Sequence, residues 1–164
     1  SVHGRTRADK YMGDAEYDTI AAIKQAVGIP VLANGDITSP EKARRVFEHT
    51  GCDGIMVGRG AHGRPWLFRE IQHYLRTRDL LPPPNLAEQR DIVLRHLGSL
   101  HAFYGPDLGV RFSRKHLGWY ADHLPEGQAL SRQFNTLINA DQQIRLVSEY
   151  FLRRAESRWP DAAA

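Results

Sequence analysis

Apolar residues in the first half of the chain form short runs separated by longer stretches of helical periodicity. The runs at residues 29–33 and 53–57 have the length of strands. Residues 15–27, 40–49 and 65–75 repeat apolar side chains at steps of three and four, which predicts amphipathic helices. This alternation is typical of βαβ units and predicts an α/β fold with a parallel sheet. The run Ile55-Met56-Val57 further predicts a strand buried on both faces.

The pattern changes at residues 81–86, where three consecutive prolines exclude a helix. No strand pattern returns after this segment. Amphipathic helices are predicted at residues 87–104, 110–123, 128–139 and 141–158, with short turns such as Gly105-Pro106 between them. Short connections favour antiparallel neighbours in a bundle. The chain therefore divides into an α/β part at residues 1–80, a linker at 81–86 and a helical domain at 87–158.

A glycine-rich turn follows each apolar run of the first half: Asn34-Gly35-Asp36 and Gly58-Arg59-Gly60. Ligands of parallel α/β folds bind at the carboxyl ends of strands, where both turns are expected. Glycine lets the backbone approach a ligand closely, and free N–H groups beside a helix start attract anions. A guanidinium adds a forked pair of hydrogen bonds to phosphate. The pattern predicts a phosphate site; the alternative is two ordinary βα connections with helix-capping residues.

Val2 and His3 read as the end of a further strand, which runs into a basic loop. His3 would then lie at the carboxyl tip of that strand, beside the two glycine-rich turns. A surface loop histidine is the simpler alternative. Because the chain opens on a strand end and not on a methionine, we expect the sequence to begin in the middle of a domain.

One predicted helix of the second half carries a basic stripe. Arg111, Arg114, Lys115 and Gly118 are spaced so that they share one helical face, with Trp119 and Tyr120 nearby. Such a face can hold a nucleic-acid backbone. The alternative is a solvated helix face without a partner. His96 and His101, five residues apart, do not share a face and are interpreted as surface or packing residues.

Composition narrows the class of protein. The formal net charge of +3 permits a nucleic-acid partner without requiring one. The single cysteine, Cys52, excludes a disulfide within the chain and a cysteine-rich metal site, and it is predicted to be a small core residue. No apolar stretch is long enough to span a membrane, and no signal peptide is visible. We expect a cytoplasmic protein with no membrane partner and no metal.

Several runs together resemble one family, the flavin-dependent tRNA-dihydrouridine synthases. The runs that carry the resemblance are residues 3–6, 29–37, 58–61 and 63–66, and those that point to the bacterial B-type branch, which includes NifR3-like proteins, are residues 68–71, 103–106 and 114–120. The resemblance extends from Val2 to about Tyr150. It is specific because the runs occur in combination, not singly.

The resemblance implies a fold and a set of binding residues. Members have an N-terminal (β/α)₈ TIM barrel that holds FMN and a C-terminal helical domain that binds tRNA. This chain would be the last strands and helices of the barrel followed by the bundle, with the three strand tips as barrel strands six to eight. The positions that match the family's FMN-binding residues are His3, Asn34, Gly35, Asp36, Gly58 and Arg59. The positions that match the family's tRNA-contacting residues are Arg111, Arg114 and Lys115.

The resemblance also implies an activity, the reduction of a tRNA uridine to 5,6-dihydrouridine with FMN and NADPH, by a protein we expect to be monomeric. The family's cysteine proton donor lies on an earlier barrel loop, and Cys52 does not match it. We therefore assign no catalytic residue here and expect the chain alone to be inactive. Two alternatives remain: a stand-alone RNA-binding helical module without activity, and a different phosphate-binding barrel enzyme of metabolism.

A partial barrel has a consequence for stability. Missing neighbours would leave open strand edges and bare apolar surface. We expect residues 1–80 to be less stable than residues 85–158, or to pair with another copy. Amide hydrogen exchange would measure this, and better protection of the first part than of the bundle in a monomer would contradict it.

Overall fold

The computed structural model describes residues 1–6, 8 and 12–157 of the 164-residue chain. The chain divides into two compact units, Ser1–Pro82 and Pro83–Ala164. The division falls within the proline-rich segment at residues 81–86. Part of the predicted basic loop, at residues 7 and 9–11, and the last residue of the predicted final helix lie outside the described residues.

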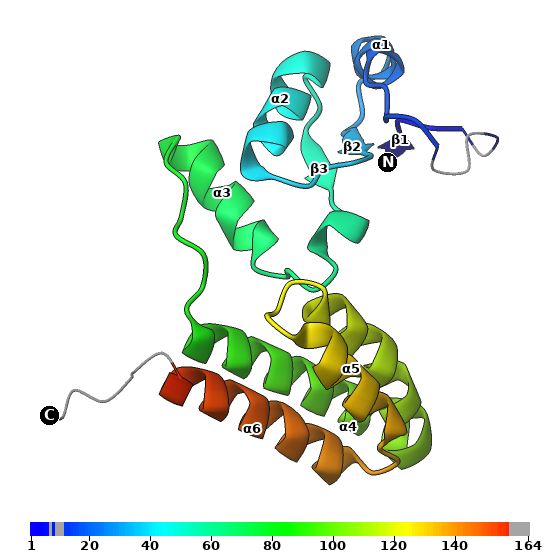
Figure 1. Ribbon diagram of the computed structural model, residues 1–164. Helices are drawn as coiled ribbons and strands as arrows, with labels where there is room; N and C mark the ends of the chain where they lie inside the picture. The colour runs from blue at the N-terminus through cyan, green and yellow to red at the C-terminus, as the bar shows by residue number, and fades with distance from the viewer. Residues whose placement is uncertain (7, 9–11, 158–164) are drawn as a thin grey trace, which may run out of the picture. The chain divides into compact units, whose positions relative to one another are not determined.

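The first unit is a three-stranded parallel sheet with helical crossovers (Figure 1). Its strands are β1 (Val2–His3), β2 (Leu32–Asn34) and β3 (Gly54–Met56), in the order β1-β2-β3. Helix α1 (Asp18–Ala26) connects β1 to β2, α2 (Pro40–Thr50) connects β2 to β3, and α3 (Leu67–Thr77) follows β3. The parallel βαβ arrangement predicted from the apolar pattern is confirmed.

Local signals fix the limits of α2, the helix that follows the first glycine-rich turn. The Ser39 hydroxyl accepts a hydrogen bond from the Lys42 backbone N–H at 3.2 Å, and Pro40 occupies the first helical position. Gly51 ends the helix with a φ of 61°. The apolar face of α2 packs in a core with the other helices and with β2. Cys52 is buried in this core, which confirms its prediction as a packing residue.

The prediction that the strand at residues 55–57 is buried on both faces is wrong. Ala33 is fully buried and pairs with Ile55, whereas Leu32 and Met56, on the opposite face, remain 37% and 44% exposed. Alternate residues of a strand face opposite sides of a sheet. The helices of the described first unit thus bury one face and leave the other apolar and open.

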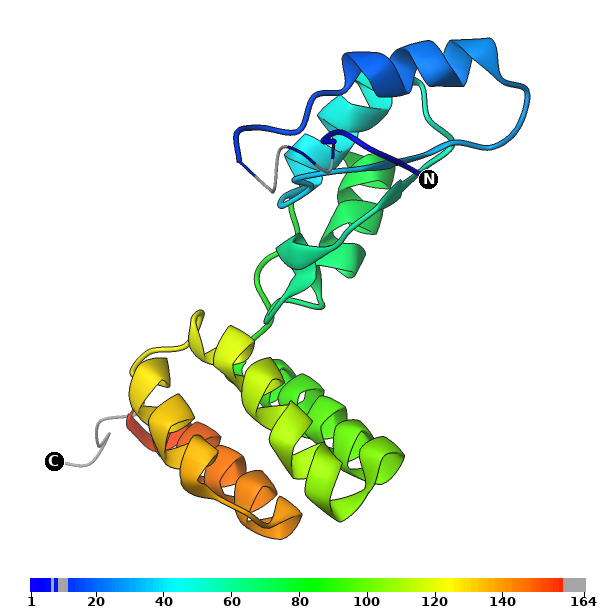
Figure 2. The same ribbon diagram turned by 90° about the vertical axis from the view of Figure 1, so that its right-hand side faces the viewer.

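The second unit is a helical bundle of α4 (Leu86–Ala121), α5 (Gly127–Thr136) and α6 (Ala140–Ser157). Helix α4 is broken at Gly105, whose φ of 78° and ψ of −179° are not helical. The two halves of α4 then run back along each other (Figure 2), so that the ring of His96 contacts those of His116 and Tyr120. The two helices predicted at residues 87–104 and 110–123 correspond to these halves.

Several polar side chains form hydrogen bonds where the helices of the bundle meet. His101 Nε2 lies 2.9 Å from Oε1 of the fully buried Gln143, whose amide donates to the Val110 carbonyl at 3.2 Å. His96 Nδ1 lies 3.0 Å from the Tyr120 hydroxyl. Both histidines are therefore packing residues, one of the two roles, surface or packing, interpreted from their spacing. Within the described part of the chain, every helix is too short or too polar to cross a lipid bilayer.

Candidate phosphate-binding site

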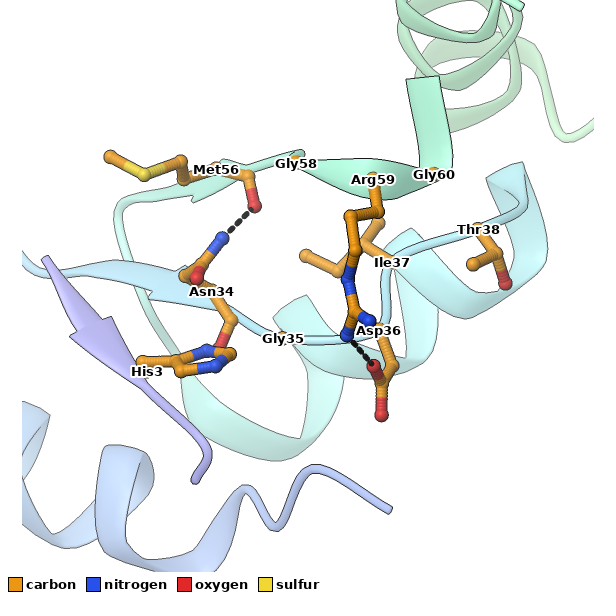
Figure 3. Close-up of a pocket in the computed structure, with 10 residues that line it drawn as sticks. All are labelled: His3, Asn34, Gly35, Asp36, Ile37, Thr38, Met56, Gly58, Arg59 and Gly60. Atoms are coloured by element: carbon orange, nitrogen blue, oxygen red, sulfur yellow. Dashed lines mark hydrogen bonds and ion pairs between the residues drawn. The ribbon is translucent and has the colours of Figure 1, made fainter. Parts of the chain in front are cut away.

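One hollow of about 590 Å³ lies at the carboxyl ends of the three strands (Figure 3). Both glycine-rich turns contribute to it, together with the tip of β1. Its lining residues are His3, Asn34, Gly35, Asp36, Ile37, Thr38, Met56, Gly58, Arg59 and Gly60. All six positions singled out from the sequence for a cofactor lie in this set. The two turns, 24 residues apart between Asn34 and Gly58, thus form one site.

The parallel register brings the strand tips together. Asn34 pairs with both His3 and Met56 across the sheet. Its side-chain amide donates to the Met56 carbonyl at 2.7 Å, which holds the ends of β2 and β3 side by side. The imidazole Nδ1 of His3 lies 3.2 Å from the Asn34 carbonyl. His3 is therefore at the rim of the hollow, next to the first turn.

The first turn depends on glycine at position 35. Gly35 has a φ of 135° and the following Asp36 a φ of 46°, both on the positive side that most side chains avoid. A Cβ on Gly35 would lie 2.7 Å from the Cβ of Ala15. The Tyr17 hydroxyl donates to the Gly35 carbonyl at 2.7 Å and fixes the peptide from outside. The turn is therefore held in one conformation by its neighbours.

Asp36 has a supporting role that the sequence did not indicate. Its carboxylate accepts two hydrogen bonds from Arg5, the Nη1–Oδ1 one at 2.8 Å, and a third from the Ala15 backbone N–H at 2.9 Å. The Arg5 hydrogen bond lowers the pKa of Asp36 to about 2, against the opposing effect of burial. Because a carboxylate repels phosphate, the geometry favours the backbone of Asp36, and not its side chain, as the ligand-facing group.

The second turn lies directly against the first. It continues from Gly58 into a short 3₁₀ helix, η2 (Arg59–Ala61). A Cβ on Gly60 would lie 2.3 Å from the Ile37 carbonyl oxygen, so only glycine allows this approach. Arg59 reaches across the hollow toward Asp36, with Nη2 3.9 Å from Oδ1 (Figure 3). A long, exposed ion pair of this kind contributes little free energy, so a stronger anion can compete for the guanidinium.

The arrangement suits an anion with several oxygens. Among the described residues that line the hollow, Asp36 alone is acidic, and its charge is balanced by Arg5. Thr38, which also lines the hollow, lies two residues before the start of α2, whose N-terminal end carries partial positive charge. Sequence reasoning missed Ile37, Thr38 and Met56 as lining residues. The place of Ile37 and Thr38 between Asp36 and the Ser39 cap was the available signal for those two.

The low pKa of Asp36 predicts a loss of stability in acid. A carboxylate whose pKa is depressed from 3.8 to about 2 stabilises the fold above pH 4, and that contribution disappears as the pH falls toward 2. We expect the first unit to lose about 2 kcal/mol of unfolding free energy over this interval. Asp36→Asn should remove most of this pH dependence. An unchanged pH profile of hydrogen exchange in the variant would contradict the assignment.

The three residues singled out for RNA lie in the second unit and differ in exposure. Arg111 and Lys115 are exposed on the second half of α4. Arg114 is half-buried, and its Nη2 donates to the Leu137 carbonyl at 3.1 Å, at the end of α5. The structure thus brings Arg111 and Lys115 to the surface and directs Arg114 toward the α5 terminus.

Comparison with known proteins identifies the family. Residues 1–156 match the family model described as dihydrouridine synthase (Dus). The chain belongs to the dihydrouridine synthase family. It is 59% identical over 157 residues to tRNA-dihydrouridine synthase B of Pseudomonas putida, covering 96% of this chain and 47% of that protein. It is 58% identical over 154 residues to the same enzyme of Pseudomonas aeruginosa, covering 94% and 46%.

A third relative agrees with the B-type assignment. The Escherichia coli tRNA-dihydrouridine synthase B is 53% identical over 152 residues, covering 92% of this chain and 47% of the relative. The resemblance to the B-type branch read from the sequence is therefore confirmed. The chain spans about half the length of these dihydrouridine synthases.

Proposed function

We propose that this chain supplies the last three strands of the barrel and the helical domain of an FMN-dependent tRNA-dihydrouridine synthase. The carrying observation is the convergence of two glycine-rich turns on one hollow at the strand tips. The phosphate sites of (β/α)₈ barrels are built from the loops after strands seven and eight. On this proposal β1, β2 and β3 are barrel strands six, seven and eight. We further propose that the protein acts in the cytoplasm.

The open face of the sheet supports the barrel assignment. Leu32 and Met56 lie on the face that the helices leave exposed. In a closed barrel that face points inward and is filled by side chains of the other strands. The exposed apolar side chains would then be part of the barrel interior. The edge strands β1 and β3 would pair with further strands of the barrel.

The hollow fits the phosphate end of FMN. We propose that the backbone N–H groups of Gly35, Asp36, Gly58 and Gly60 face the phosphate, with Arg59 as its charged partner. The close approach of Gly60 to Ile37 leaves no room for a side chain between the two turns. His3, at the rim, borders the flavin end. When bound, FMN supplies the hydride chemistry, with NADPH as reductant.

The residues of this chain position the reactants and do not supply a proton donor. Arg5 and Tyr17 hold the first turn, so the phosphate meets a site that is already formed. Arg111 and Lys115, with the guanidinium of Arg114 at the end of α5, would contact tRNA phosphates and set its register without reading sequence. The target uridine must leave its stack to reach the flavin.

A chimaera tests the proposal directly. Residues 1–156 of this chain should replace the matching half of the Escherichia coli relative, and the chimaera should make dihydrouridine in tRNA, detected by mass spectrometry. Arg59→Ala in the chimaera should lower its apparent affinity for FMN by about tenfold or more, because a charged hydrogen bond to phosphate is lost. A folded chimaera that makes no dihydrouridine at saturating FMN and NADPH would contradict the proposal.

The isolated chain should be inactive in the same assay. Cys52 does not match the family's cysteine proton donor, and it is buried in the core. With tRNA, FMN and NADPH present, we expect no dihydrouridine above the level of a protein-free control. Product formed by the isolated chain would show that a proton donor had been overlooked.

A second candidate function is a stand-alone RNA-binding module. It is favoured by the division of the chain, since residues from Pro83 onward form a unit with a core of their own. In this case tRNA retention would depend on salt and on Arg114 and Lys115, whereas FMN and Arg59 would have no role. The effect of Arg59→Ala on the chimaera separates the two candidates.

A further inference from the structure

Aromatic side chains cluster on the surface of the bundle where α4 is broken. Phe103, Tyr104 and Phe112 are 81%, 41% and 43% exposed. The ring centroids of Phe103 and Tyr104 are 4.9 Å apart, and those of Tyr104 and Phe112 are 4.6 Å apart. Leu108, on the second half of α4, is half exposed and lies between Tyr104 and Phe112 in the sequence. A contiguous exposed aromatic group of this kind usually marks a binding surface.

The cluster continues as a stripe along the second half of α4. From Leu108 onward its members follow the spacing of one helical face, opposite the buried positions Val110, Ser113, Leu117, Tyr120 and Ala121. Tyr104, from the first half of α4, joins them through its ring contact with Phe112. We name it the aromatic–basic stripe, and it consists of Tyr104, Leu108, Arg111, Phe112, Lys115 and Trp119. Lys115 Nζ lies 5.0 Å from the Trp119 ring centre, so cations and rings alternate along the face.

We propose that the aromatic–basic stripe stacks unpaired nucleobases of an RNA while Arg111 and Lys115 hold the flanking phosphates. The inference rests on the proposed function and names how the helical unit grips its substrate. Proteins recognise single-stranded RNA by stacking bases on aromatic side chains and tracking the backbone with cations. A paired helix offers its phosphates but not its base faces, so the stripe should prefer looped RNA over duplex.

The charge pattern favours a polyanion over an apolar protein surface. Arg111 and Lys115 are exposed and interrupt the aromatic residues, and burying them against a second copy would cost free energy unless each were paired. Asp107 is the acidic residue next to the stripe on its own helix, and Asp122 at the end of α4 accepts a hydrogen bond from Gln128 at 2.9 Å. The centre of the stripe therefore carries positive charge.

Binding of the whole chain to unmodified tRNA and to a fully paired RNA duplex tests the inference. Phe112→Leu keeps an apolar side chain but removes the ring. We expect it to weaken tRNA binding about tenfold, to leave duplex binding unchanged and to leave the salt dependence unchanged. Phe68→Leu, which alters a 53% exposed aromatic of the first unit, is the matched control and should have no effect.

Lys115→Ala separates this inference from the proposed function. This variant should bind both tRNA and the RNA duplex more weakly. It should also reduce the slope of log affinity against log salt concentration by about one. If Lys115→Ala weakens binding but Phe112→Leu does not, the stacking inference is wrong and the tRNA assignment stands. If the wild-type chain does not bind tRNA, both are wrong. If the wild type dimerises and Phe112→Leu is monomeric with unchanged tRNA affinity, the stripe is an interface between copies and the inference is overturned.

Discussion

Replacing Gly35 with alanine is expected to abolish FMN binding and to destabilise the first unit by about 3 kcal/mol. The new Cβ would lie 2.7 Å from that of Ala15, and the φ of 135° is one that alanine does not adopt without strain. Either the turn changes conformation or α1 and its preceding loop move. In both cases the backbone amides lining the hollow lose their arrangement. Hydrogen exchange in α1 and β2 measures the stability, and FMN titration of the chimaera measures the binding.

Gly28→Ala is the matched control for this variant. A Cβ at Gly28 meets no atom within 4 Å, and the residue precedes β2 in the same unit. Its substitution should change stability by less than about 0.5 kcal/mol and leave FMN binding intact. If Gly35→Ala behaved like Gly28→Ala in both measurements, the constrained turn would not be needed for the site.

Replacing Gly127 with alanine should have the largest effect on the bundle. Gly127 begins α5, and a Cβ there would lie 1.9 Å from the Ala121 carbonyl oxygen, well inside contact distance. Ala121 is the last residue of α4, so the two helices cannot keep their connection without a backbone shift. We expect a loss of at least about 3 kcal/mol in the unfolding free energy of the second unit, measured by urea denaturation.

A glycine-to-alanine substitution at another position of the bundle should have the opposite effect on stability. Gly98 lies inside α4, and a Cβ there meets no atom within 4 Å outside its own helix. Alanine at this position gains helix propensity, so Gly98→Ala should stabilise the second unit by up to about 1 kcal/mol. Equal effects of the two variants would mean that the close approach at Gly127 is not a constraint on the fold.

The apolar pattern was sufficient to predict the alternation of strands and helices, because period and run length depend on local sequence. The hollow could also be anticipated. Parallel strands carry their following turns to the same edge of the sheet, so Asn34 and Gly58 had to come together once the sheet was parallel. The break in α4 was marked by Gly105-Pro106, whose chemistry disfavours a continuous helix.

Other features depend on tertiary contacts that sequence spacing does not encode. The ion pair between Arg5 and Asp36 joins residues 31 positions apart, and nothing in the turn itself indicated that its carboxylate would be engaged. Helical spacing placed Arg114 with Arg111 and Lys115, but packing against α5 directs it to the Leu137 carbonyl. The exposure of Met56 likewise follows from which face the helices cover.

The central claim is that backbone amides of the two glycine-rich turns together bind the phosphate of FMN. Amide chemical shifts of the ¹⁵N-labelled chain test it most directly, with FMN, riboflavin and inorganic phosphate as ligands. FMN and inorganic phosphate should shift the amides of Gly35, Asp36, Gly58 and Gly60, and riboflavin, which lacks the phosphate, should leave them in place. Equal shifts with FMN and riboflavin, or FMN-induced shifts confined to other residues, would contradict the account.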